Sequence, residues 1–250
     1  MPRTPQPPIL SLSRVSKSFG GLMAVNYASF SVNQGELRAL IGPNGAGKTT
    51  LLNLITGIHT ASSGTILFKN EDITRLPPDR ISRRGISRTL QVTSLFSGLT
   101  VYENVWAAVQ SRKRFFNPFV RAERWKDVAG KTEAMLELTG LSDKAQTVCS
   151  ELSYGDQRIL EMGIALSTEP DLLLLDEPTA GLSTRESMGL VKRMRAMLSG
   201  QTILLVEHDM GVVMELSDRI TVLHYGEVLA EGTPAEIMGN EEVHKVYLGT

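Results

Sequence analysis

Cysteine is almost absent from this sequence, as are long apolar runs and an excess of charge of either sign. The single cysteine, Cys149, excludes an internal disulfide framework and a cysteine-rich metal site. No apolar run reaches the roughly 20 residues that span a bilayer, and the N-terminus lacks the regions of a signal peptide. The 27 acidic and 26 basic residues nearly cancel, so the net charge points to neither nucleic acid nor a membrane surface as a partner.

The remaining composition is that of a soluble globular protein, with 42% hydrophobic and 21% charged residues. A length of 250 residues allows one large domain or two small ones, with a sizeable core in either case. Residues 1–8 carry four prolines, which predicts a disordered lead. We therefore expect the folded part to begin at residue 9.

A glycine-rich segment at residues 42–49 fits the pattern G-x-x-x-x-G-K-[ST]. Apolar residues precede it as in a buried strand, and others follow it at helical spacing. This context predicts a loop whose backbone N–H groups surround phosphate, with Lys48 adding charge and Thr49 a hydroxyl for Mg²⁺. The alternative is a glycine-rich turn that binds nothing. The predicted ATP-binding residues of the loop are Gly42, Pro43, Asn44, Gly45, Ala46, Gly47, Lys48, Thr49 and Thr50.

An apolar run at residues 172–175 ends in two carboxylates, Asp176 and Glu177. It predicts a buried parallel strand, and open α/β sheets bind ligands at the carboxyl ends of such strands. Because side chains alternate along a strand, the two acids should point differently. Asp176 suits an outer ligand of Mg²⁺, and Glu177 suits the general base that polarises a water for attack on a γ-phosphate. The alternative is a pair of ordinary solvated acids.

Two other residues are candidates because of their positions. His208 follows a predicted buried strand at residues 202–206, which places it at the same sheet edge, although a lone histidine there is usually structural. Asp209 can cap the next helix and leave His208 to face a phosphate. Phe19 precedes the strand that leads into the loop, so it can stack on a nucleotide base; the alternative is packing in the core.

The segments around the loop predict a small β-rich flap. Strands near residues 9–15, 27–32 and 65–68 are expected to pair antiparallel. Residues 77–88 then become basic and are expected to be helical.

The middle of the chain is predicted to be helical. Helices are expected over residues 101–111 and 125–139, and Ser153 suits the N-cap of the next one. The run 112–119 combines basic and aromatic residues; this fits nucleic acid or lipid headgroups but is more typical of a solvated connection. Gln91, a glutamine in a loop, indicates almost nothing by itself.

The glycine-rich loop, the segments at residues 152–157 and 172–177, and His208, taken in that order, resemble the nucleotide-binding subunit of ATP-binding cassette transporters. The resemblance covers residues 9–248. It implies an α/β fold with a P-loop NTPase (RecA-like) core, an antiparallel β flap and an inserted α-helical subdomain. The implied parts are a nucleotide core with its flap over 9–90 and 165–232, a helical subdomain over 91–164 and a C-terminal helical tail over 233–250.

The resemblance also implies roles for particular residues. Phe19 corresponds to the aromatic that stacks on the base, and Gln91 to a loop residue that senses Mg²⁺ and the membrane subunit. Glu177 corresponds to the catalytic base and His208 to the γ-phosphate switch. With Thr49 and Asp176, Gln91 completes the implied Mg²⁺ set.

The family's signature segment reaches across a dimer to the nucleotide held by the other subunit. In this chain the segment is Ser153, Tyr154, Gly155 and Asp156. The implied dimer is a homodimer or a heterodimer with a second ATP-binding cassette subunit, because one chain holds half of each site.

Several segments look like the branched-chain amino acid uptake ATPases, and urea and amide importers share much of the pattern. These segments are residues 19–26, 88–91, 152–155, 207–210 and 246–249. The resemblance implies ATP hydrolysis coupled to transport, with two membrane permease subunits and, indirectly, a periplasmic substrate-binding protein as partners. It also implies a cytoplasmic subunit that is peripheral on the inner face of the cell membrane.

The sequence departs from the general family pattern at three positions. Tyr154 replaces a glycine of the signature, Asp156 replaces its glutamine, and Ser183 stands where the family has aspartate. We expect an acid near a triphosphate to repel it and slow hydrolysis. Ser183 can still cap a helix, so we expect the fold to be kept. Because the family's aspartate lies in the loop that crosses the dimer, we expect communication between the two nucleotide sites of the dimer to be affected.

Two other classes of function use the same motifs. A soluble cassette ATPase of repair, cluster assembly or translation would have the same site without transport. A regulatory module would bind ATP without hydrolysing it, but Lys48, Asp176, Glu177 and His208 are all present and favour hydrolysis.

Overall fold

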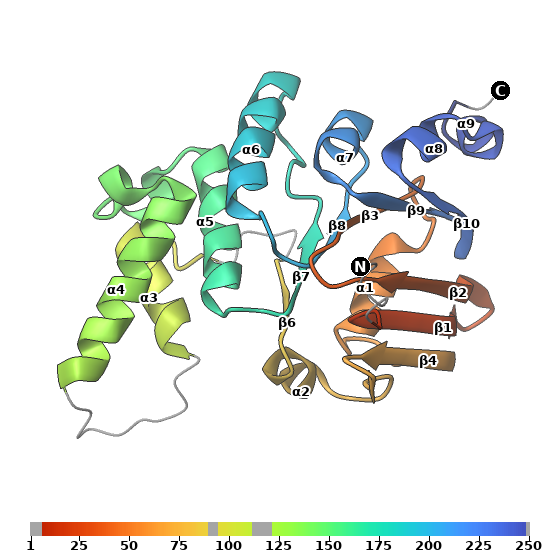
Figure 1. The fold of residues 1–250 in the computed structure, drawn as a ribbon, viewed down its shortest axis with the longest axis horizontal. Helices are drawn as coiled ribbons and strands as arrows, with labels where there is room; N and C mark the ends of the chain where they lie inside the picture. The colour runs from red at the N-terminus through yellow and green to blue at the C-terminus, as the bar shows by residue number, and fades with distance from the viewer. Residues whose placement is uncertain (1–6, 90–94, 112–121, 249–250) are drawn as a thin grey trace, which may run out of the picture. The chain divides into compact units, whose positions relative to one another are not determined.

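The computed structural model describes residues 7–89, 95–111 and 122–248 (Figure 1). Within these residues one sheet has the strand order β2-β1-β4-β5 and the other the order β10-β9-β3-β8-β7-β6. The strands are β1 (Leu10–Phe19), β2 (Leu22–Val32), β3 (Leu37–Ile41), β4 (Ser63–Phe68), β5 (Glu71–Asp72), β6 (Ile86–Arg88), β7 (Leu172–Asp176), β8 (Ile203–Val206), β9 (Arg219–His224) and β10 (Glu227–Gly232).

Helices follow or separate these strands. They are α1 (Lys48–Ile55), α2 (Pro78–Arg83), α3 (Val101–Ser111), α4 (Ala122–Thr139), α5 (Tyr154–Ser167), α6 (Thr184–Met197), α7 (Met210–Leu216), α8 (Pro234–Met238) and α9 (Glu241–Leu248), with 3-10 helices η1 (Ser142–Lys144) and η2 (Cys149–Glu151). Within the described ranges, none of these helices combines the length and the hydropathy that a membrane crossing requires.

The larger sheet is parallel except at one end. Strand β3 pairs in parallel with β8 and β9, and β7 pairs in parallel with β8 and β6, while β10 returns antiparallel along β9. Every residue of β7 and β8 is buried, as expected for a strand covered on both faces. These pairings confirm the predicted α/β fold class.

The alternation of side chains along β3 divides the core into two layers. Leu40 packs in a cluster with apolar residues of α1 and of the smaller sheet. Ala39 and Ile41 point the other way and pack with residues of α7, α8 and α9. The helix that follows the glycine-rich loop is therefore held by a core shared between both sheets.

The smaller sheet is the predicted antiparallel flap, with β1 paired to both β2 and β4. Its first two strands are longer than predicted, because β1 continues to Phe19 and β2 starts at Leu22. Arg14 and Tyr27 have φ angles of 47° and 48°, and each lies within a register shift of the β1–β2 pairing. Such bulges interrupt the alternation of buried and exposed side chains along a strand. Because strand length was predicted from that alternation, the predicted strands were too short.

The basic segment at residues 77–88 is only partly helical, so the prediction was wrong at its end. Helix α2 stops at Arg83, and residues 86–88 form β6, which pairs in parallel with β7. Three residues are too few to show a strand period, and their neighbour lies more than 80 positions away.

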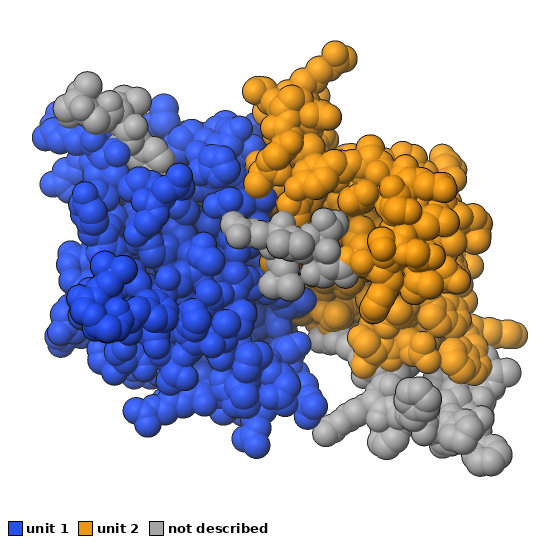
Figure 2. Space-filling view, turned by 180° about the vertical axis from the view of Figure 1, so that it is seen from behind, with its two compact units in different colours: residues 1–88, 171–177, 200–250 blue, residues 89–170, 178–199 orange. Residues whose placement is uncertain are grey.

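Contacts within the chain divide it into two units, which Figure 2 colours separately. The first comprises residues 1–88, 171–177 and 200–250, and the second residues 89–170 and 178–199. The division implied by the family resemblance differs, because it places 178–199 in the nucleotide core. Helix α6 of this segment packs on α4 and α5, which explains its place in the second unit.

Polar caps start the helices of the second unit. Thr100 and Glu103 exchange the hydrogen bonds of a capping box, and so do Ser183 and Glu186. The Ser153 hydroxyl accepts a hydrogen bond from the amide of Asp156 at the start of α5. These caps confirm the predicted helix starts, including that at Ser183.

Candidate nucleotide-binding site

The glycine-rich loop joins the end of β3 to the start of α1. Gly47 is the N-cap of α1 and has a φ angle of 101°, and a Cβ built there would lie 2.4 Å from the carbonyl oxygen of Ala24. Both constraints require glycine. In the described part of the chain, the amides of Gly45, Gly47 and Lys48 have no hydrogen-bond acceptor. Unpaired amides at a helix N-terminus form a site for an anion.

Lys48 lies buried below this loop. Its ammonium donates to the carbonyl oxygens of Gly42, at 2.6 Å, and Pro43, at 3.1 Å. Burial lowers the pKa of Lys48, whereas the negative charges of Glu177 and Asp176 raise it. The ammonium is thus held by two neutral acceptors and drawn toward the two carboxylates.

Asp176 is the last residue of β7 and is almost completely buried. Its Oδ2 accepts a hydrogen bond of 2.7 Å from Arg88 of β6, whose other terminal nitrogen donates to Asn53 of α1 at 2.6 Å. Its Oδ1 is also buried but has no hydrogen-bond partner in the described residues. An unpaired carboxylate oxygen in the interior is costly unless something binds it.

The residues at this sheet edge fit a Mg²⁺ ion that arrives with a nucleotide. The unpaired Oδ1 of Asp176 is an oxygen ligand of the kind that Mg²⁺ prefers, and Thr49 carries an exposed hydroxyl at the start of α1. No group of three or more His, Cys, Asp or Glu side chains in the described ranges could hold a metal by itself. Mg²⁺ sites that rely on one carboxylate and on substrate phosphates have this sparse protein set.

Glu177 follows directly and has an unusual backbone. Its φ angle is 48°, and its amide donates to the carbonyl of Val206 on β8 at 2.9 Å. Its side chain is only partly buried, unlike that of Asp176. A strained backbone that exposes one carboxylate beside a buried one is typical of functional sites.

A hollow of about 440 Å³ brings several predicted residues together within the first unit. Its lining residues are Phe19, Leu22, Met23, Ala24, Asn44, Gly45, Ala46, Gly47, Lys48, Thr49, Thr50, Glu177 and Tyr225. Phe19 is 43% exposed, which excludes the alternative that it packs in the core. The Lys17 ammonium lies 5.0 Å from its ring centroid, and His59 meets the ring edge-on at 5.2 Å.

Leu22, Met23, Ala24 and Tyr225 line the hollow but were not among the predicted site residues. The first three follow Phe19 in the flap, so their proximity to Phe19 was the available signal. Tyr225 lies in the turn between β9 and β10, about 200 residues later, and no motif marked it.

His208 and Gln91 are not placed in this hollow. His208 is exposed at the end of β8, with its Nδ1 3.9 Å from the Glu207 carboxylate, and Asp209 caps α7 as predicted. Gln91 lies outside the described residues, as does the basic and aromatic run at 112–119. The roles predicted for these residues stay predictions.

The signature residues lie at the start of α5 in the second unit. The Asp156 carboxylate is bound by Lys144 at 2.5 Å and Arg193 at 2.8 Å, and the Ser153 hydroxyl donates to it at 2.8 Å. Although burial raises the pKa of Asp156, these three hydrogen bonds lower it, to about 2 overall. Two cations therefore offset the charge of Asp156, and its predicted effect on hydrolysis stays a prediction.

Tyr154 also has local partners that explain a departure from the family pattern. Its hydroxyl donates to the carbonyl of Ala180 at 3.2 Å and accepts from Arg158, whose guanidinium lies 4.9 Å from the ring centroid. Ala180 belongs to the loop between Glu177 and α6. A tyrosine here thus ties the signature segment to that loop, which a glycine could not do.

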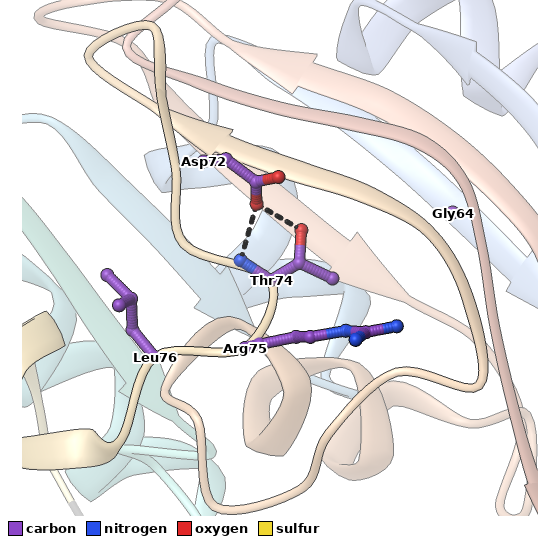
Figure 3. A pocket seen from close by; sticks show the side chains of 5 residues that line it. All are labelled: Gly64, Asp72, Thr74, Arg75 and Leu76. Carbon is purple, nitrogen blue, oxygen red and sulfur yellow. Dashed lines mark hydrogen bonds between the residues drawn. The ribbon is translucent and has the colours of Figure 1, made fainter.

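A second hollow, of about 480 Å³, is lined by Gly64, Asp72, Thr74, Arg75 and Leu76 (Figure 3). Thr74 donates its amide and its hydroxyl to Asp72, at 2.8 and 2.5 Å. These hydrogen bonds lower the pKa of Asp72. The dashed contacts in Figure 3 are those of a turn, and none of the predicted site residues lies in this hollow.

The phosphate loop lies between the parallel strand β3 and helix α1, and Asp176 and Glu177 lie at the end of β7 in the same sheet. This arrangement defines a P-loop nucleotide-binding protein. Residues 25–180 match the model of the ABC transporter family, and residues 227–250 match that of the branched-chain amino acid ATP-binding cassette transporter. The chain belongs to the ABC transporter family, and its fold is that of the family's ATPase cassette.

Relatives resemble the chain over nearly its whole length. It is 40% identical to the high-affinity branched-chain amino acid transport ATP-binding protein LivG of Escherichia coli, over 97% of this chain and 98% of the relative. It is 41% identical, with the same coverage, to the high-affinity branched-chain amino acid transport ATP-binding protein BraF of Pseudomonas aeruginosa. The lipopolysaccharide export system ATP-binding protein LptB of Haemophilus influenzae is 33% identical over 96% of this chain and 97% of the relative.

Solved structures support the same assignment. The ADP conformation of an ATP-binding cassette of an ABC transporter has a TM-score of 0.84 and 30% identity, covering 98% of this chain and 100% of that one. A dimeric cassette in a post-hydrolysis state, bound to ADP and phosphate, has a TM-score of 0.73 and 25% identity, covering 90% and 98%.

Substituting Gly47→Ala should abolish ATP binding, because a Cβ at this position collides with the Ala24 carbonyl and opposes the positive φ angle. Equilibrium dialysis with ATP measures the loss. Gly21→Ala is the matched control, since its Cβ meets no atom within 4 Å and its φ angle is not in the left-handed region. Equal ATP affinity in both variants would contradict the geometry of the loop.

Substituting Asp156→Asn should lower the free energy of unfolding at pH 7 by about 1–3 kcal/mol, because two cations lose a charged partner. The folded-state pKa of Asp156 is depressed from 3.8 to about 2. The stability it contributes is therefore complete above pH 4 and disappears as the pH falls toward 2. Urea unfolding at several pH values measures this difference, with exposed Asp143→Asn as control. A difference from wild type that is the same at every pH would contradict it.

Proposed function

We propose that this chain is the ATP-hydrolysing subunit of an ABC importer for branched-chain or other hydrophobic amino acids. The assignment of the cargo rests on the match of residues 227–250 to the branched-chain amino acid cassette model, together with the 40% identity to LivG. The cassette fold alone does not identify the cargo, because LptB, from a lipopolysaccharide export system, is 33% identical over 96% of this chain.

The nucleotide is bound by residues that act on its different parts. Phe19 stacks on the base, and the free amides of Gly45 and Gly47 donate to phosphate oxygens with the dipole of α1 behind them. Lys48 exchanges its two carbonyl acceptors for phosphate oxygens when ATP enters. This exchange keeps the buried ammonium satisfied in both states.

Mg²⁺ would be held by Thr49 and by the unpaired Oδ1 of Asp176, with Gln91 as a further ligand. When bound, the ion neutralises charge on the β- and γ-phosphates. Arg88 holds the other oxygen of Asp176, so the carboxylate is fixed before the ion arrives.

Glu177 accepts the proton of the attacking water. Its strained backbone turns the carboxylate into the hollow that also contains the phosphate loop. The water then attacks the γ-phosphate in line, and ADP and phosphate leave. His208 contacts the γ-phosphate from the adjoining strand end and reports its presence.

Hydrolysis requires a second cassette, which is either another copy of this chain or a different subunit. Ser153 and Gly155 at the start of α5 bind the γ-phosphate that lies in the other subunit's loop. Closing of the two cassettes moves two membrane permease subunits, to which a periplasmic binding protein delivers the cargo. The chain then works at the inner face of the cell membrane.

Substituting Glu177→Gln should leave ATP binding intact, lower hydrolysis by at least about 100-fold and trap an ATP-bound dimer, because the water loses its proton acceptor. Equilibrium dialysis measures ATP binding, phosphate release measures hydrolysis, and light scattering detects the dimer. Glu137→Gln, an exposed site on α4, is the matched control. Full ATP turnover in Glu177→Gln would show that Glu177 is not the proton acceptor for the attacking water.

The cargo is tested by reconstituting the subunit in liposomes with two permease subunits and a binding protein of a branched-chain amino acid importer. Leucine, isoleucine or valine should stimulate ATP hydrolysis, and urea and short amides should not. Stimulation by urea or an amide alone would assign the chain to the related importers instead. Hydrolysis that does not respond to any membrane partner would support a soluble cassette ATPase.

A further inference from the structure

Tyr225 is an exposed aromatic residue in a backbone conformation that tyrosine seldom adopts. It lies in the turn between β9 and β10, its φ angle is 46°, and it is 80% exposed. A residue with a Cβ is strained in the left-handed region, and glycine or asparagine would fit this position better. An exposed, strained tyrosine is an observation that calls for a functional explanation.

The turn that carries Tyr225 is fixed to the phosphate loop. The amide of Gly226 donates to the Ala46 carbonyl at 3.0 Å, and its own carbonyl accepts from the amide of Asn26 at 2.8 Å. The Asn26 side chain donates to Glu227 at 2.5 Å. These contacts hold the hairpin between the loop and the flap, so Tyr225 has a set position beside the nucleotide hollow.

The hollow has two chemically different parts. The stretch from Asn44 to Thr50 supplies amides and the Lys48 ammonium. Phe19, Leu22, Met23 and Tyr225 supply an apolar wall, and each of these four is at least 43% exposed. Large apolar side chains gathered around a hollow and left open to solvent indicate a ligand surface.

We propose that Tyr225 is a second aromatic contact for the base and ribose of the bound nucleotide, beside Phe19. The proposal rests on the proposed function, because it adds a subsite to the same ATP site. Every base has a π-face, and phenylalanine, leucine and methionine offer no hydrogen bond to a base edge, so this wall binds by stacking and apolar contact. ATP and GTP should therefore depend on Tyr225 to the same degree.

The test compares nucleotides with inorganic tripolyphosphate on the full chain. Tyr225→Asn removes the ring while suiting the left-handed backbone, and it should weaken ATP and GTP binding about five- to tenfold, as expected for a stacking contact. Tripolyphosphate affinity should not change, because the loop is intact. Tyr225→Phe should restore nucleotide affinity. Tyr27→Asn is the matched control, since Tyr27 is also an exposed tyrosine with a positive φ angle, and it does not line the hollow.

Competition titrations with a fluorescent ATP analogue measure all three variants and wild type. Unchanged ATP affinity in Tyr225→Asn would overturn the proposal. An equal loss for ATP and tripolyphosphate would also overturn it, because the hairpin would then act on the loop and not on the base. If the wild-type chain did not bind ATP at all, that result would contradict the proposed function itself, and the proposed subsite would be contradicted with it.

Discussion

The parallel pairing of β3, β8 and β7 is the constraint on which the site depends. Leu40 lies level with Val206, and Val206 lies level with Asp176. This register brings the end of β3, where the phosphate loop starts, to the same sheet edge as Asp176 and Glu177. A slip by one residue would turn each side chain to the opposite face and separate the carboxylates from Lys48.

Charge at that edge is arranged in advance of a ligand. Lys48 is buried against two carbonyls, and Asp176 has one oxygen bound by Arg88 and one without a partner. Each buried group keeps a binding capacity that an incoming phosphate or metal can use, so less reorganisation is needed when the nucleotide binds. In the second unit, by contrast, Asp156 is already offset by two cations.

Much of the site was predictable because its chemistry lies in contiguous patterns. The strand, loop and helix around residues 42–55 follow one another, and so do the apolar strand β7 and its two acids. The capping boxes are equally local, since cap and partner are three residues apart. The fold class followed from these segments because each was long enough to show its period.

What escaped prediction depends on contacts between distant residues. Arg88 meets Asp176 only because a three-residue strand pairs with β7, and Arg193 meets Asp156 across 37 positions. Tyr225 enters the hollow through a hairpin tip that no pattern distinguishes from an ordinary turn. Periodicity and motifs describe neighbours along the chain, so side chains brought together by tertiary packing leave no such signal.

The central claim is that the strand ends form a triphosphate site around Lys48. The most direct measurement is the calorimetric affinity for ATP of Lys48→Gln, compared with wild type and with the exposed-site control Lys126→Gln. The loop retains its amides in this variant, but the ammonium that Gly42 and Pro43 hold is gone. Lys48→Gln should bind ATP at least about tenfold more weakly than wild type, and the control should bind as wild type does. Equal affinity in all three proteins would contradict it.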